Sequence, residues 1–242
     1  MKPIAIALAM AVGLAVSQAS AQQPSVESRL LSNPIMGPMF AEMKADFPDD
    51  FAGLVDTYER ALKTGTVAQA EARGFEYGRN IVISRLSDMA SAPSPQLLAL
   101  LDGQRDLIVE LKKENTGYCA AFGMSGLPLG AQLSPRALSM LNSLGVVQLR
   151  AERAGIDHPT ERSAITPADV QGLRNAMMAD GASADLVALV FASPGLQTAS
   201  VSDQCEGSVA LYRGMADLPP ESGARIFSTI LIATKGAMRK NS

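Results

Sequence analysis

The chain has 242 residues, of which 47% are hydrophobic and 19% are charged, a balance typical of a chain that folds around a core rather than staying disordered. A net charge of −3 provides no basic face for nucleic acid, so we expect no nucleic-acid partner. One histidine and two cysteines cannot build most zinc sites or the two-histidine iron site, so we expect no metal and no cofactor.

The first 21 residues have the pattern of a secretory signal peptide. Lys2 supplies positive charge, the run from Ile4 to Val16 is apolar, and Ala19-Ser20-Ala21 forms a small-residue cleavage site. The apolar run is too short to span a bilayer, and we expect no transmembrane segment in the mature chain. We therefore predict cleavage between Ala21 and Gln22 and a protein that is periplasmic or secreted.

From residue 36 onward the apolar residues recur with helical spacing, and no stretch alternates as a strand does, so we predict an all-α fold. The first helix has one apolar stripe, formed by Met36, Met39, Phe40, Met43 and Phe47. Pro48 ends this helix and begins a second one, which runs to near Gly65. A longer helix follows from about residue 66 to residue 90.

The second half of the chain repeats one signal for a helix start. Ser94-Pro95, Ser134-Pro135 and Thr166-Pro167 each place a capping hydroxyl before a proline, and an apolar stripe follows each pair. Further helices are expected over 183–191 and 202–215 and from residue 219. We therefore predict an irregular bundle of about seven to nine helices with one disulfide.

One long segment interrupts the helical pattern. Residues 115–130 contain four glycines and one proline, so we predict a loop there. We expect a single helical domain over residues 22–242, because neither half alone has many large apolar residues. A subdivision near 115–133 is the alternative.

The two cysteines, Cys119 and Cys205, are predicted to form a disulfide, because an exported protein enters an oxidising compartment. Neither lies in a Cys-x-x-Cys motif, and neither has a neighbouring basic residue that would stabilise a reactive thiolate. The bond would connect residues 86 positions apart in the sequence.

No pattern in the sequence indicates a catalytic site. His158 lies in a polar turn, where histidines are more often solvated than catalytic. Ser125 lies in a segment that has only half of the Gly-x-Ser-x-Gly nucleophile elbow, because Leu127 replaces the second glycine. Most acidic residues lie on the polar faces of predicted helices. We therefore predict no catalytic residue and favour a protein that is not an enzyme.

The stripe of Met36, Met39, Phe40, Met43 and Phe47 has three interpretations. Core packing is favoured, because methionine fills irregular gaps between helices. The same face could line a groove for an apolar ligand or a partner helix. A Cu(I) site built from the thioethers is the weakest of the three.

Three classes of function follow. The first is a non-catalytic periplasmic factor that binds another envelope protein, as an adaptor, inhibitor or immunity-type protein. The alternative is a periplasmic carrier of a small apolar or lipid-like ligand. The third is an envelope hydrolase that uses paired carboxylates, for which Asp49 and Glu76 are the leading candidates.

Overall fold

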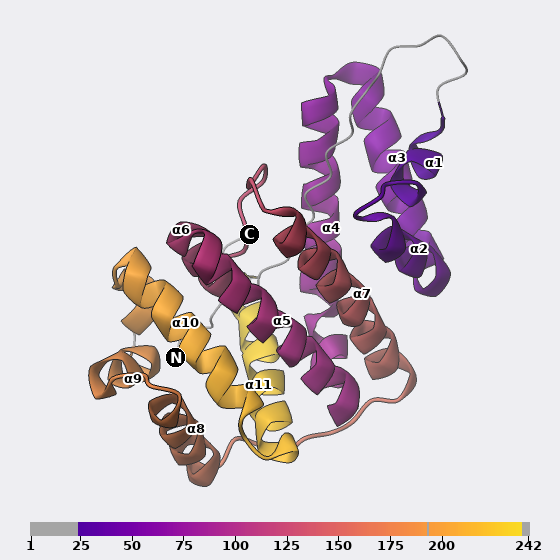
Figure 1. Ribbon diagram of the computed structural model, residues 1–242. Coiled ribbons are helices and arrows are strands. Elements are labelled where there is room, and N and C mark those ends of the chain that lie inside the picture. The colour runs from indigo at the N-terminus through magenta and orange to yellow at the C-terminus, as the bar shows by residue number, and fades with distance from the viewer. Residues whose placement is uncertain (1–23, 193, 239–242) are drawn as a thin grey trace.

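A computed structural model describes residues 24–192 and 194–238 of the chain (Figure 1). These residues form eleven α-helices and one short 3-10 helix and contain no strand, which confirms the predicted all-α class. The predicted signal peptide, residues 1–21, lies outside the described residues. The predicted count of seven to nine helices is too low, because two helices have no sequence pattern that marks them.

The first of these two helices is α1 (Val26–Leu31), which has only six residues and therefore no repeated stripe. The second is α6 (Thr116–Met124), which lies where the glycine content predicts a loop. Asn115 caps α6 by accepting a hydrogen bond from the backbone N–H of Tyr118. Burial of Cys119 and Phe122 stabilises this helix despite its two glycines, so the predicted loop over 115–130 is wrong for its first half.

The N-terminal helices surround one apolar core. They are α1, α2 (Gly37–Asp46), α3 (Pro48–Thr64) and the first turns of α4 (Val67–Ala90), which form the upper group in Figure 1. Phe47 ends α2 and precedes α3, and Pro48 occupies the first position of α3, where its missing N–H costs nothing. This core includes Leu30, Met36, Met39, Phe40, Met43, Phe47, Phe51, Leu54 and Tyr58.

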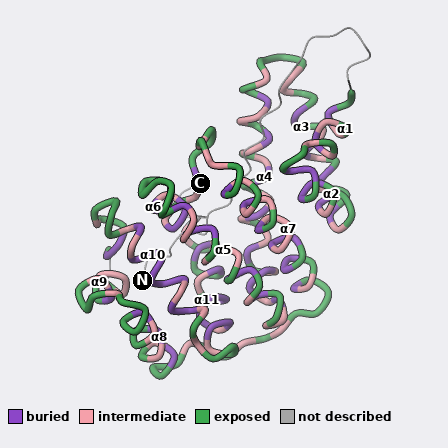
Figure 2. The backbone as a smooth tube through the Cα atoms, viewed as in Figure 1, coloured by how far each residue is buried: buried purple, intermediate pink, exposed green. Residues whose placement is uncertain are grey.

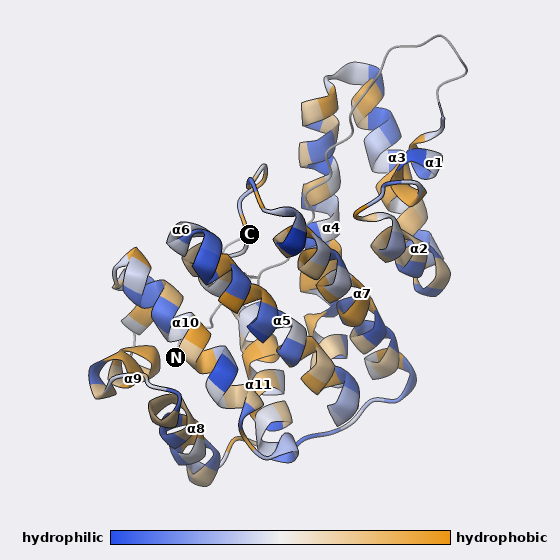
Figure 3. Cartoon of the chain, in the orientation of Figure 1, coloured by the Kyte–Doolittle hydropathy of each residue, from blue (hydrophilic) through white to orange (hydrophobic). Residues whose placement is uncertain are grey.

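The remaining helices surround a second, larger core. They are α5 (Ser94–Glu114), α6, α7 (Pro135–Asp157), α8 (Pro167–Ala179), α9 (Ala184–Phe191), α10 (Val201–Ala216) and α11 (Pro220–Met238), with the 3-10 helix at Gly195–Thr198. Figure 2 shows that their buried residues lie mainly where the helices face one another, and Figure 3 shows that most of these helices carry both apolar and polar residues.

Helices α4 and α7 contribute to both cores. On α7, Leu149 belongs to the first core, while Leu144 and Ala151 belong to the second. Gly155 brings α7 so close to α4 that a Cβ atom there would lie 1.8 Å from the backbone oxygen of Asp88. The two cores are therefore joined along the contact between α4 and α7.

The predicted helix starts are largely confirmed. Ser134 accepts a hydrogen bond from the N–H of Ala137, and Thr166 forms a reciprocal capping box with Asp169. Ser94 differs, because the cap position is occupied by Pro93 and Ser94 is already the first residue of α5.

The predicted disulfide is confirmed. Cys119 of α6 and Cys205 of α10 are bonded, with 5.2 Å between their Cα atoms, and both are buried. Among the described helices, none has the length and apolar character that crossing a membrane requires.

Candidate functional site

The apolar stripe of α2 lies inside the first core. Its five side chains, Met36, Met39, Phe40, Met43 and Phe47, are at most 6% exposed. Met39 packs against Gly145 of α7, where a Cβ atom would lie 2.6 Å from its sulfur. A ligand or partner helix could contact these residues only if α2 separated from α7.

A groove of about 420 Å³ lies between α4 and the segment that follows α6. We call it the α4–loop groove and define it by its two walls. The helix wall consists of Phe75, Arg79, Val82, Ile83 and Leu86. The loop wall consists of Ala121 from the last turn of α6 and of Ser125, Gly126, Leu127, Pro128 and Leu129 after it.

The helix wall follows from the spacing of its residues along α4. Positions 75, 79, 82, 83 and 86 are separated by three or four residues or lie next to each other, so they share one face of the helix. Val82 and Leu86 are buried and form the apolar base of this wall. Phe75 and Ile83 are half-buried, and Arg79 is exposed.

The loop wall is shaped by the end of α6. The backbone N–H groups of Ser125 and Gly126 both donate to the oxygen of Ala121, each at 2.8 Å. Gly126 has a φ of 105°, a conformation that a side chain disfavours, and there the chain leaves the helix. Leu127 is then buried, while Leu129 remains 47% exposed.

The loop wall is anchored on both sides. Before it, the disulfide joins α6 to α10. After it, the Tyr118 hydroxyl accepts a hydrogen bond from the backbone N–H of Gln132 at 3.0 Å, and the Glu114 carboxylate accepts one from the Ser134 hydroxyl. The disulfide and these two hydrogen bonds therefore fix the loop wall opposite α4.

Of the described residues that line the groove, only Arg79 is charged. Among the described residues, neither the Arg79 guanidinium nor the Ser125 hydroxyl has a hydrogen-bond or ion-pair partner. The other arginines of α4 differ, because Arg73 pairs with Glu76 at 3.2 Å and Arg85 pairs with Asp50. The groove therefore combines apolar walls with two uncommitted hydrogen-bond donors, one from each wall.

Ser125 is the C-cap residue of α6, so it follows a helix rather than joining a strand to one. His158 ends α7, is exposed, and does not line the groove that Ser125 lines. Within the described ranges, no three His, Cys, Asp or Glu side chains are placed to hold a metal ion.

Several acidic residues of the helices pair with separate basic residues. Asp50 binds Arg85, Glu76 binds Arg73, and Glu110 binds both Lys113 and Arg136. Asp49 is exposed in the first turn of α3. The leading acidic candidates, Asp49 and Glu76, do not line the α4–loop groove.

Sequence reasoning missed one buried carboxyl group, that of Glu152 in α7. Its Oε1 accepts a hydrogen bond from the Gln148 side chain at 2.9 Å, while its buried Oε2 has no hydrogen-bond partner. Burial raises the pKa of Glu152 to about 7, and the Gln148 hydrogen bond and the charge of Arg85 only partly offset this. The helical repeat of Leu141, Gln148, Glu152 and Gly155 was the signal that could have revealed it.

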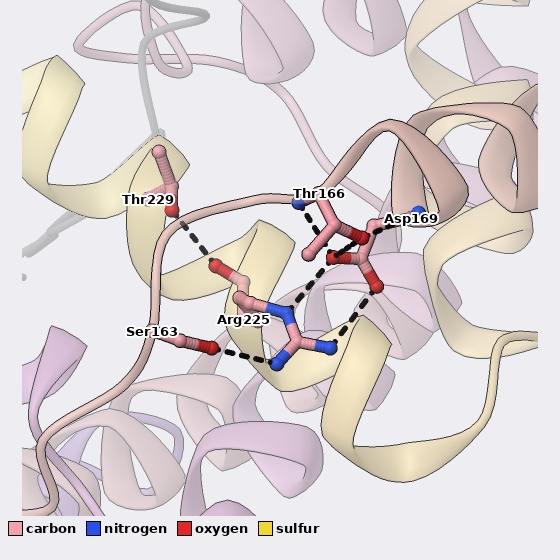
Figure 4. A network of polar contacts seen from close by, with 5 residues as sticks. All are labelled: Ser163, Thr166, Asp169, Arg225 and Thr229. Atoms are coloured by element: carbon pink, nitrogen blue, oxygen red, sulfur yellow. Dashed lines mark hydrogen bonds and ion pairs between the residues drawn. The ribbon is translucent and has the colours of Figure 1, made fainter.

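A second polar cluster fixes α8 against α11 (Figure 4). Asp169 accepts hydrogen bonds from Arg225 and from the N–H and hydroxyl of Thr166, and Arg225 also donates to Ser163. These bonds, above all those from Arg225, hold the pKa of the Asp169 carboxyl well below its usual range. Because these side chains form hydrogen bonds with one another, the cluster stabilises the fold and leaves few polar atoms available to a ligand.

Comparison of the chain with protein-family models, with curated proteins and with solved structures gave no match. The α4–loop groove is therefore the candidate site on the strength of its geometry.

Proposed function

We propose that this protein is an exported, non-catalytic binding protein that holds a small apolar molecule in the α4–loop groove. The observation that carries this proposal is the groove itself, whose 420 Å³ falls within the size range of small-molecule pockets. Among the described lining residues only Arg79 and Ser125 have polar side chains, and a few polar groups among apolar side chains are typical of such pockets. The signal-peptide pattern of residues 1–21 and the disulfide support export.

The distribution of exposed apolar side chains favours a small ligand over a large protein partner. The large exposed apolar residues of the described chain come from six separate segments, and of these only Leu129 lines the groove. Single apolar side chains on a surface are ordinary, whereas a protein interface needs a contiguous patch. The separate partners of Asp50, Glu76 and Glu110 support a role without catalysis.

The test is binding of a neutral fluorescent probe, N-phenyl-1-naphthylamine, to the mature protein. We expect saturable fluorescence enhancement, because the apolar walls exclude water from the probe. Ala121→Phe places a ring in the groove and should weaken binding at least tenfold. Ala188→Phe, at an exposed position of α9, is the matched control and should bind as the wild type does. Absence of saturable binding, or unchanged binding by Ala121→Phe, contradicts the proposal.

A second candidate function is the envelope protein-binding factor, and α9 is the observation that favours it. Among its apolar residues, only Val187 is buried, while Leu186, Leu189, Val190 and Phe191 remain partly exposed. Such a short apolar helix could anchor a partner. Crosslinking in periplasmic extract tests this: a specific crosslinked partner should be lost with Leu189→Glu and retained with Ala121→Phe.

A further inference from the structure

The polar groups of the α4–loop groove indicate the charge of its ligand. Arg79 projects from α4 and Ser125 follows α6, so each wall supplies one donor. An arginine is always charged at physiological pH and has five N–H donors but no acceptor. Its charge in the groove is therefore permanent.

Among the described residues, no carboxylate neutralises that charge. The described residues that line the groove include no Asp or Glu, and within this part of the chain Arg79 takes part in no ion pair. Asp50 and Glu76, the acidic partners of the neighbouring arginines, are already bound to Arg85 and Arg73. An anion in the groove would gain an ion pair without displacing an existing one, whereas a cation would be repelled.

We propose that the ligand of the groove is an apolar molecule with a single carboxylate, an inference that rests on the proposed function. The carboxylate forms an ion pair with the Arg79 guanidinium and accepts a hydrogen bond from the Ser125 hydroxyl. The apolar tail lies against Phe75, Ile83 and Leu127. Arg79 and Ser125 thereby select the headgroup, while the apolar walls contribute most of the affinity.

The experiment compares three probes of equal chain length, decanoate, decanol and decylamine, by their displacement of N-phenyl-1-naphthylamine from the mature protein. We expect decanoate to bind at least tenfold more tightly than decanol, and decylamine to bind most weakly. The advantage of decanoate should shrink at high salt, because Arg79 is exposed and its ion pair is screened.

Two variants locate the effect. Arg79→Gln should lose the preference for decanoate over decanol. Arg73→Gln removes an arginine of the same helix that is already paired with Glu76, so it should keep the preference. Thermal unfolding of both variants verifies that they are folded.

The outcomes separate the two proposals. Equal binding of decanoate and decanol by the wild type, or a preference that survives in Arg79→Gln, overturns the carboxylate ligand while the groove remains a binding site. Absence of saturable binding of the neutral fluorescent probe to the wild type overturns both the ligand and the proposed function.

Discussion

Arg225 holds the carboxylate of Asp169 in a two-point contact, with its Nε 2.9 Å from Oδ2 and its Nη2 3.1 Å from Oδ1. The contact joins residues 56 positions apart and fixes the start of α8 to the side of α11. Because the Asp169 side chain is also part of the capping box at the start of α8, one carboxylate serves both the local helix start and the tertiary contact.

Arg225→Met is expected to lower the melting temperature by several degrees at pH 7, because it leaves the buried Asp169 carboxylate without its main partner. The pKa of Asp169 is depressed in the folded state, so its contribution to stability is present above the unfolded pKa near 3.8 and is lost as the pH falls further. The difference between wild type and variant should therefore shrink below pH 4. Melting curves at pH 7 and pH 3 measure this, and an equal difference at both values contradicts it.

Glu152→Gln is expected to stabilise the protein above pH 7. The folded pKa of about 7 lies above the usual value of 4.5, so the folded state favours the protonated acid and wild-type stability falls as the pH rises through this interval. The loss is about 3 kcal/mol when Glu152 is fully ionised. Glutamine is neutral at every pH and can still accept the hydrogen bond from Gln148.

Urea unfolding at pH 5 and pH 8 measures the effect of Glu152→Gln. The variant should resemble the wild type at pH 5 and exceed it at pH 8. Glu76→Gln, on an exposed carboxylate, is the control and should change little at either pH. Equal destabilisation by Glu152→Gln at both pH values is the result that contradicts the buried acid.

Removal of the disulfide by a Cys119→Ala, Cys205→Ala double variant should cost about 4–5 kcal/mol of unfolding free energy, because the bond closes a long loop in the unfolded chain. The same variant should also bind N-phenyl-1-naphthylamine more weakly, since Cys119 anchors the helix that supports the loop wall. Denaturant unfolding of the variant, and of the wild type with and without reductant, measures the change in unfolding free energy. An unchanged midpoint after demonstrated reduction contradicts it.

Gly126→Val should destabilise the fold by about 1–3 kcal/mol, because valine is strained at a positive φ. It should weaken probe binding as well, because Gly126 shapes the loop wall. Gly236→Ala is the control, since nothing in the structure lies within 4 Å of the added Cβ atom and alanine favours a helix. A Gly126→Val variant that is as stable as the wild type contradicts this prediction.

Local signals in the sequence predicted much of the fold. The stripe from Met36 to Phe47 predicted α2, and the hydroxyl–proline pairs at Ser134 and Thr166 predicted the starts of α7 and α8. These signals work because capping and helical periodicity involve residues only three or four positions apart. Helix α6 escaped prediction because its stability comes from the contacts of Cys119 and Phe122 with distant helices rather than from its own glycine-containing sequence.

The sequence by itself determined that the chain is helical, that its two cysteines are suited to a disulfide, and that it has no strong catalytic motif. Only the tertiary structure decided where α4 meets the segment after α6, so that Phe75 and Leu127, 52 positions apart, line one groove. It also decided that Glu152 is buried while most other carboxylates reach solvent or a cation. The reason is physical: helix formation depends on neighbours along the chain, whereas a groove or a buried charge depends on which helices pack together.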